Sequence, residues 1–276
     1  MNANFYMLEK EWLEHKIITR IPVVLLLCGV VFLLSLLMNS TIQSNVTFEL
    51  TYQNDGFESG FELGKQLSHM VLVFSGLLSI LLTSLYFPKT LRKERQEGSV
   101  MFWRSMPVTD LNIHVVKLAF GLLVVPLICS MLVFSADFLM WIINLVMSEQ
   151  FPLFFTGESL FYVVSHWLEF VGRMWLVGLA LLPFATIAMA ISQKVNSPLL
   201  VMLVGFYVIK LLANNLFATD VIGHFFSAIT SLPLDVMIEA NPMTAFANAG
   251  IINLLLFAGL GVVGLAVSLR LSRTLD

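Results

Sequence analysis

The sequence predicts an all-α integral membrane protein with six transmembrane helices, on three observations. The chain has 276 residues, of which 58% are hydrophobic and only 12% are charged. Soluble domains average roughly 45–50% apolar and about 25% charged residues, so this chain lacks the charge to cover a water-facing surface. Six apolar runs are long enough to cross a bilayer, which takes about 20 residues each. Lysine and arginine also gather in the segments on one side of these runs.

The apolar runs give the order of the predicted spanning helices. They cover residues 21–38, 67–87, 118–147, 174–191, 198–217 and 251–269. The third run is longer than one crossing requires, so we expect it to tilt or to project from the bilayer. Residues 159–173 also have a helical composition and are expected to extend the fourth helix outward.

The distribution of basic residues predicts that both termini are cytoplasmic. Of the 15 lysines and arginines, 12 lie in the N-terminal segment, the second–third and fourth–fifth links, and the C-terminal tail. The opposite side carries Lys65 and Arg173 among many acidic residues. Cytoplasmic segments carry the excess of Lys and Arg, and termini on one side require an even number of crossings. Six crossings satisfy both conditions.

Residues 4–16 form a separate predicted element. Phe5, Leu8 and Trp12 share one helical face, with charged residues spread over the rest of the surface. Such a pattern is typical of an amphipathic helix lying in the membrane interface, with its tryptophan at headgroup depth. The alternative is a solvated extension of the first spanning helix.

The segment 218–250 is too apolar for an aqueous loop. We expect short helices that dip partway into the exterior side of the membrane, with Pro233 and Pro242 as breaks. Asn241 and Pro242 are an N-cap and a first-turn proline, and they are expected to open the last helix.

The connection between the second and third spanning helices carries the strongest functional signal. After a charge cluster, a short helix over about residues 97–105 would place Phe102, Trp103 and Met106 on one face, and Pro107 would end it. Thr109 can cap the next helix, with Asp110 in its first turn. Exposed aromatic residues beside charges are typical of a docking site for a partner protein. Simple anchoring in the interface is the alternative, because Trp and Arg are enriched there.

This connection resembles that of the ABC-2 type transporter permeases. The resemblance rests on Glu94-Arg95-Gln96-Glu97-Gly98-Ser99, then Met106-Pro107-Val108-Thr109, then Lys117, and on the predicted layout of the whole chain. It implies a coupling helix between the second and third spanning helices that docks on a separate ATPase subunit. The coupling residues would be Arg95, Gly98, Phe102, Trp103, Met106 and Pro107.

The resemblance also implies the partners and the mode of action. ATP-driven closure of two ATPase subunits would push two coupling helices together and switch the cavity from inward- to outward-facing. The chain would pair with a second permease, identical or related, in the bacterial cytoplasmic membrane, and would export its substrate. It would carry no cofactor, because ATP and magnesium would bind the partner. The apolar interior favours an amphiphilic or hydrophobic substrate.

Ionisable residues at membrane depth are candidates for function by default. Asp137, Glu169, Arg173 and Lys210 are predicted in the outer half, as an outer gate or as substrate contacts. Glu169 and Arg173 can pair at i,i+4, and His166 lies one turn away. Lys210 can pair with Asp137 or extend toward the interface, so structural pairing is the alternative to a functional role. Pro126 and Pro183 are expected to bend their helices, and Gly259, Gly261 and Gly264 to allow close helix contact.

Other function classes lack their signatures. The net charge of −3 argues against nucleic-acid binding. Gly60-Phe-Glu-Leu-Gly64-Lys65-Gln66 is one residue short of a phosphate-binding loop and lacks its hydroxyl residue. No Cys or His spacing typical of a metal site is present. An intramembrane enzyme and an ATP-independent secondary transporter remain as alternatives, although no protease motif and no repeated halves support them.

Overall fold

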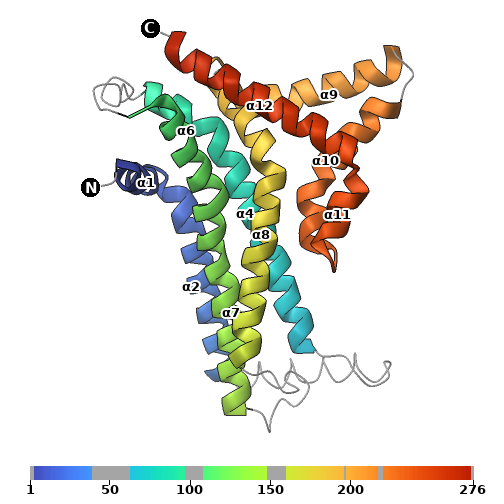
Figure 1. Cartoon of the computed structure of the whole chain (residues 1–276). Helices are drawn as coiled ribbons and strands as arrows, with labels where there is room; N and C mark the ends of the chain where they lie inside the picture. The colour runs from blue at the N-terminus through green and yellow to red at the C-terminus, as the bar shows by residue number, and fades with distance from the viewer. Residues whose placement is uncertain are drawn as a thin grey trace. The chain divides into compact units, whose positions relative to one another are not determined.

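The computed structural model describes residues 3–38, 63–96, 108–147, 160–195, 197–216 and 220–274, and every regular element in these ranges is helical. Figure 1 labels the elements. They are α1 (Ala3–Glu14), α2 (Lys16–Met38), α4 (Leu63–Gln96), α6 (Asp110–Ala119), the π-helix η1 (Phe120–Val124), α7 (Val125–Met147), α8 (Leu160–Ser192), α9 (Pro198–Leu216), α10 (Asp220–Ile238), α11 (Pro242–Ala249) and α12 (Ile251–Thr274).

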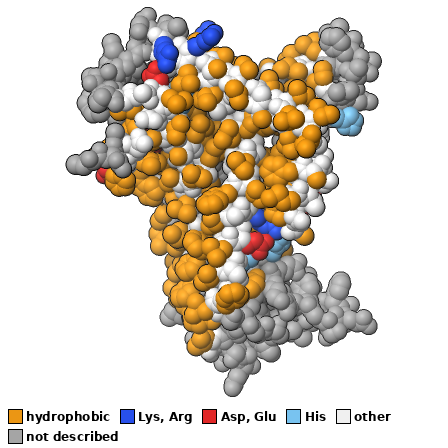
Figure 2. All heavy atoms as spheres, viewed as in Figure 1, with side chains coloured by type: hydrophobic (Ala, Val, Ile, Leu, Met, Phe, Trp, Pro, Cys, Tyr) orange, Lys and Arg blue, Asp and Glu red, His pale blue; other side chains and the backbone are white. Residues whose placement is uncertain are grey.

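Four helical stretches in the described residues are long and apolar enough to cross a membrane. They are Leu67–Glu94, Asp110–Ile142, Leu160–Ser192 and Ile251–Arg273. On the face seen in Figure 2, hydrophobic side chains cover most of the surface of the described helices, as lipid-facing helices require. The prediction of a multi-pass helical membrane protein is therefore supported. Residues 21–38 and 198–217, predicted to cross as well, fall largely within α2 and α9, and their crossing stays a prediction.

The chain divides into two compact units. The first contains Met1–Ile18, Leu77–Pro126 and Gly172–Asp276, and the second contains Thr19–Gly76 and Leu127–Val171. The core of the first unit holds Tyr86, Phe87 and Phe120, all fully buried. In the second unit, Leu72, Val133 and Phe170 are buried in the same way.

Two predictions about helix ends at prolines need correction. The second apolar run ends at residue 87 in the sequence, but α4 continues through Pro88 to Gln96. Pro233 was expected to break the exterior segment, but it lies inside α10. Neighbouring helices can compensate for a proline in a membrane helix, which is why the break does not follow from the residue alone.

Asn241 and Pro242 open a helix, although not the last one. The Asn241 Oδ1 accepts from the Met243 N–H at 3.1 Å, and Pro242 is the first residue of α11. α11 ends at Ala249 because Gly250 adopts φ +81°, a backbone conformation that side chains disfavour. α12 then begins separately at Ile251. The predicted cap is confirmed, and the predicted continuity with the final helix is wrong.

Pro126 is accommodated by the π-helix that precedes it. The Val125 N–H bonds to the Phe120 carbonyl, five residues back. The next such bond would join residue 126 to Gly121, but proline has no N–H. The Thr83 hydroxyl donates to the Gly121 carbonyl at 3.0 Å instead. A side chain from α4 thus satisfies the acceptor that Pro126 leaves open, in a buried position where an unpaired carbonyl is costly.

Two glycines of α12 pack closely against α8, both within the first unit. A Cβ on Gly261 would lie 2.7 Å from Pro183 Cα, and one on Gly264 would lie 3.0 Å from Ile187 Cγ1. The Thr186 hydroxyl also donates to the Gly261 carbonyl at 2.9 Å. The prediction of close helix contact is confirmed for these two glycines. Among the described residues, Gly259 has no atom within 4 Å of its Cβ position.

Gly261→Ala is expected to destabilise the protein by about 1–3 kcal/mol, because the methyl group meets backbone atoms of α8 that cannot move alone. The measurement is the midpoint of thermal unfolding in detergent. Gly259→Ala is the matched control, since its methyl group meets open space. It should leave the midpoint unchanged or raise it, because alanine favours a helix over glycine by about 1 kcal/mol. Equal midpoints for the two variants would contradict the close contact.

Candidate functional sites

The predicted coupling residues fall mostly outside the described residues. Gly98, Phe102, Trp103, Met106 and Pro107 lie in the stretch 97–107, and Arg95 lies in α4 with its side chain outside the description. The flanks of this stretch are described. α4 ends at Gln96, and α6 begins at Asp110 after the Thr109 cap, whose hydroxyl accepts from the Asn112 N–H at 3.3 Å. The predicted cap is confirmed.

A cluster of buried charges joins these two flanks to α1, all within the first unit. Lys117 of α6 forms ion pairs with Glu11 of α1 and with Glu94 of α4, the latter at 3.1 Å. The three side chains are 2%, 3% and 7% exposed, respectively. We call these residues, with Tyr86 and Thr90, the inner ionic cluster.

Hydrogen bonds satisfy the charges of the inner ionic cluster. The Tyr86 hydroxyl donates to Glu11 Oε2 at 2.6 Å, and Lys117 Nζ donates to Thr90 Oγ1 at 2.9 Å. Lys10, which is less buried, adds a second cation to Glu94 at 2.8 Å. Each carboxylate of the cluster therefore has at least one ammonium partner, and buried charges are tolerated only when they are paired and hydrogen-bonded in this way.

The electrostatic environment of α1 follows from this burial. Burial alone would raise the pKa of Glu11, but attraction to Lys117 and the hydrogen bonds from Lys117 and Tyr86 bring it below its usual value. Burial lowers the pKa of His15 to about 4, against the opposing attraction of Glu11. At neutral pH Glu11 is therefore charged and His15 is neutral. Lys93 of α4 also donates to the Glu14 carbonyl at 2.8 Å, which adds a contact at the end of α1.

The orientation of α1 reverses the usual arrangement of a soluble amphipathic helix. Its buried positions are Met7 and Glu11, whereas Phe5 and Trp12 are 68% and 46% exposed. The polar face thus packs on the protein and the predicted aromatic stripe points away from it. This is the arrangement expected of a helix whose apolar face enters a membrane interface. A turn at His15 separates α1 from α2, so α1 is a distinct helix.

A second buried polar link joins α6, α12 and Gln193, the residue directly after α8, in the first unit. His114 Nδ1 lies 2.8 Å from the Asp110 carbonyl, and its Nε2 lies 2.8 Å from Ser268 Oγ. Because a carbonyl can only accept, Nδ1 carries the hydrogen and Nε2 accepts from Ser268. The Gln193 amide donates to the Ser268 hydroxyl and carbonyl at 2.7 and 3.0 Å. The start of α6 is therefore fixed to the last part of α12.

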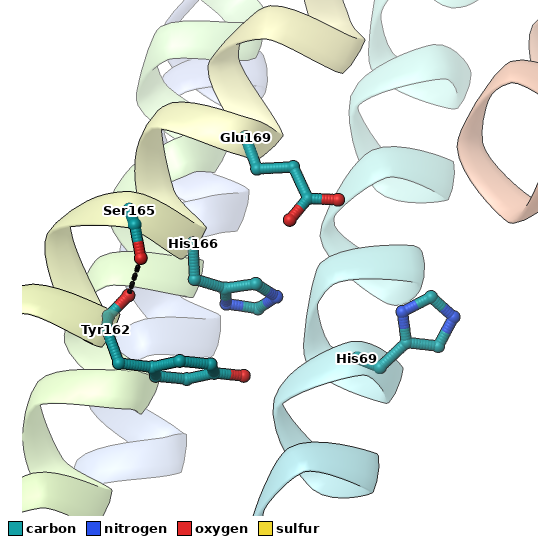
Figure 3. A pocket seen from close by; sticks show the side chains of 5 residues that line it. All are labelled: His69, Tyr162, Ser165, His166 and Glu169. Atoms are coloured by element: carbon teal, nitrogen blue, oxygen red, sulfur yellow. Dashed lines mark hydrogen bonds between the residues drawn. The ribbon is translucent and has the colours of Figure 1, made fainter. Parts of the chain in front are cut away.

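The predicted outer residues have different surroundings. In the second unit, Asp137 of α7 pairs with His166 of α8, at 2.6 Å between Oδ2 and Nδ1. Glu169 lines a pocket with His69, Tyr162, Ser165 and His166 (Figure 3). The Lys210 side chain lies outside the described residues, so its pairing with Asp137 stays a prediction. The pairing of Glu169 with Arg173 also stays a prediction.

Arg173 holds the end of α10, within the first unit. Its guanidinium donates from Nη1 to the Val236 and Glu239 carbonyls at 3.2 and 2.6 Å, and from Nη2 to the Ala240 carbonyl at 3.0 Å. The last carbonyls of a helix have no partners within the helix. A cation there is also attracted to the negative, C-terminal end of the helix dipole. These contacts give Arg173 a structural role at the end of α10, beside its predicted role as a gate or substrate contact.

Sequence reasoning missed the inner ionic cluster. In the sequence, Lys117 is one of the basic residues that predict the cytoplasmic side, and Glu11 belongs to the polar surface of a predicted amphipathic helix. One signal was available: Lys117 lies in a run of apolar residues, where a lysine must be paired or reach water. In the described residues, no group of three or more His, Cys, Asp or Glu is arranged to hold a metal ion.

Comparison with known proteins does not assign the chain to a family: no family model, curated protein or solved structure matches it.

Proposed function

We propose that this chain is the membrane-spanning permease subunit of an ATP-driven transporter of the ABC-2 type. In this proposal it works with a separate ATPase subunit and a second permease subunit in the bacterial cytoplasmic membrane. It exports an amphiphilic or hydrophobic substrate. The chain binds and moves the substrate, and the partner hydrolyses ATP.

The inner ionic cluster is the observation that carries this proposal. A coupling helix can transmit force to the spanning helices only if the helix ends on either side of it are rigidly connected. Glu94 lies two residues before the end of α4 and pairs at 3.1 Å with Lys117 of α6, so the two flanks of the stretch 97–107 are tied together. Both residues belong to the pattern that resembles the permease family. Through its ion pair with Lys117, Glu11 connects α1 to the same two helix ends.

The placement of α1 supports the proposed orientation. Its outward aromatic residues, Phe5 and Trp12, suit the membrane interface, and its buried Glu11 joins it to the helices on either side of the proposed coupling segment. We propose that this face of the protein is cytoplasmic and that α2 and α9 cross the membrane with the four longer spans. Six crossings then return the C-terminal end of α12 to the side of α1.

Trp103→Ala is expected to uncouple the transporter, because the side chain is proposed to fill a groove on the ATPase. The permease reconstituted with its ATPase should hydrolyse about tenfold more ATP for each substrate molecule exported, as expected from the loss of one aromatic anchor worth about 1.4 kcal/mol or more. The measurement is the ratio of ATP hydrolysis to transport in proteoliposomes, and Phe102→Ala should act in the same direction.

The matched control is Trp175→Ala. Trp175 is 63% exposed on α8, in a stretch long and apolar enough to cross a membrane, and it is not part of the proposed coupling segment. Its removal should leave the ratio of ATP hydrolysis to transport unchanged. Normal coupling in both Trp103→Ala and Phe102→Ala would contradict the docking role.

A further inference from the structure

His15 lies in the turn between α1 and α2 and packs against the core of the first unit. Its N–H donates to the Glu11 carbonyl and its own carbonyl accepts from the Ile18 N–H, both at 3.0 Å. Its ring meets the Tyr86 ring of α4 edge to face, with centroids 4.8 Å apart, and its centroid lies 6.5 Å from that of Phe120. One residue therefore connects α1 to the next helix and also joins α1 to the core.

Charges of both signs surround the His15 ring. The ring Nε2 lies 3.5 Å from Glu11 Oε2, and the side chain is 10% exposed. Two carboxylates favour a proton on the ring and two ammonium groups oppose it, and these four groups are Glu11 of α1, Lys93 and Glu94 of α4, and Lys117 of α6. Because these charges oppose one another, burial decides, and it lowers the pKa of His15 from its ordinary value of 6.5 to about 4.

The packing of α1 on α4 and α6 therefore depends on pH. If α1 separates from these helices, the His15 ring becomes solvated and its pKa returns to about 6.5. The separated state then binds a proton more readily than the packed state, so packing is strongest above pH 6.5 and weakens as the pH falls toward 4. Glu11 does not titrate in the upper part of this range. Burial alone would raise its pKa, but Lys117 holds the pKa below its usual value, so their ion pair persists at about pH 5.

We propose that His15 is an acid-sensitive switch that releases α1 from α4 and α6 when its ring gains a proton. A charged imidazole against the rings of Tyr86 and Phe120 loses most of its hydration, and the neighbouring charges of both signs do not compensate for that loss. The released helix has another environment to occupy, because its exposed residues Phe5 and Trp12 suit the membrane interface. This inference goes beyond the permease assignment and does not depend on it, since it concerns this chain alone.

The release of α1 can be measured as the exposure of Met7, which is 5% exposed on the face of α1 that packs on the protein. Met7→Cys introduces a thiol there, and Cys28→Ser and Cys129→Ala remove the native thiols. The full chain in nanodiscs is labelled with dithiodipyridine, a disulfide reagent that reacts with thiols in acid as well. The labelling rate is divided by the rate for a short peptide with the same substitution at the same pH. This ratio gives the equilibrium constant for the opening of α1, even where the open state is rare.

With His15 in place, the opening constant should rise about 30-fold from about pH 7.5 to about pH 5. His15→Phe keeps a ring against Tyr86 and His15→Gln keeps a polar side chain, but neither gains a proton, so each should change by less than about threefold. Both variants retain Glu14, whose pKa is raised by burial and whose protonation favours packing, so their difference from the parent isolates His15. His224→Gln, at an exposed position of α10, is the matched control and should keep the full rise.

Two results would overturn the inference: an opening constant that stays level down to about pH 5 with His15 in place, or the full rise in a folded His15→Phe or His15→Gln variant. If neither variant folds, the pH at which the rise begins decides. It must begin near pH 6.5, where a solvated histidine gains its proton, whereas a rise confined to below about pH 5 would come from carboxylates and would contradict the role of His15.

Discussion

Lys117→Met is expected to lower the free energy of unfolding by about 3–5 kcal/mol, because removing one partner of a buried ion pair leaves the Glu11 carboxylate buried without its ammonium partner. Glu11 and Glu94 would both remain in the first unit without this ammonium group. The loss should be measured as the shift in an equilibrium unfolding transition in detergent. We expect α1 to detach first, because Glu11 is its most buried polar contact.

The matched control for Lys117 is Lys10→Met, the same substitution at another partner of Glu94. The Lys10 side chain is 19% exposed, against 2% for Lys117. Its loss should therefore cost less than about 1 kcal/mol, as for partly exposed pairs. Adding Glu11→Met to Lys117→Met should recover part of the stability, since an apolar pair can replace an ionic one. Equal effects of the two lysine variants would show that the cluster is not buried in the membrane-embedded protein.

Arg173→Met is expected to cost about 3 kcal/mol or more, because charged hydrogen bonds to four carbonyls are lost and those acceptors remain without the guanidinium. Arg173→Lys keeps the charge but not the planar fork, so it should recover the stability only in part. The measurement is the same unfolding transition, together with protease cleavage between α10 and α11.

The control for Arg173 is Arg273→Met, because the Arg273 side chain is 76% exposed. It should change stability by less than about 0.5 kcal/mol, as surface substitutions usually do. Full stability of Arg173→Met would contradict the role of Arg173 at the end of α10.

The helices could be predicted from the sequence because a long apolar run in a membrane satisfies its backbone hydrogen bonds by forming a helix. The run 251–269 lies within α12, and the extension of the fourth helix by residues 159–173 corresponds to the first part of α8, which begins at Leu160. Capping was also predictable, because Thr109 and Asn241 act on backbone groups two or three residues away. Hydrogen bonds between residues this close in the chain can be predicted from a single sequence.

The contacts of the charged residues could not be predicted in the same way. Glu11 and Lys117 are 106 residues apart, and their pairing depends on how α1 packs against α4 and α6. The sequence allows Asp137 to pair with Lys210, because both are predicted in the outer half of their spans. In the structure, Asp137 pairs with His166. Helical spacing gives the depth of a residue in a span but not the direction of the neighbouring helix.

The effect of prolines was also ambiguous. Pro88 and Pro233 lie inside continuous helices, whereas Pro242 begins one. Of these three prolines, Pro242 alone follows an N-capping residue, Asn241, and that pair is the local signal that separates a helix start from an interior proline. For Pro126, the compensating group is Thr83 of another helix, which no local pattern indicates.

The most direct test of the permease assignment is a photo-crosslink from position 103 in native membranes. A photoreactive phenylalanine analogue replaces Trp103, and the crosslinked product is identified by mass spectrometry. We predict a covalent product with an ATPase that carries a phosphate-binding loop, and loss of that product when Lys117→Met removes the support of the segment. A crosslink to phospholipid alone, with no nucleotide-hydrolysing protein attached, would contradict the assignment.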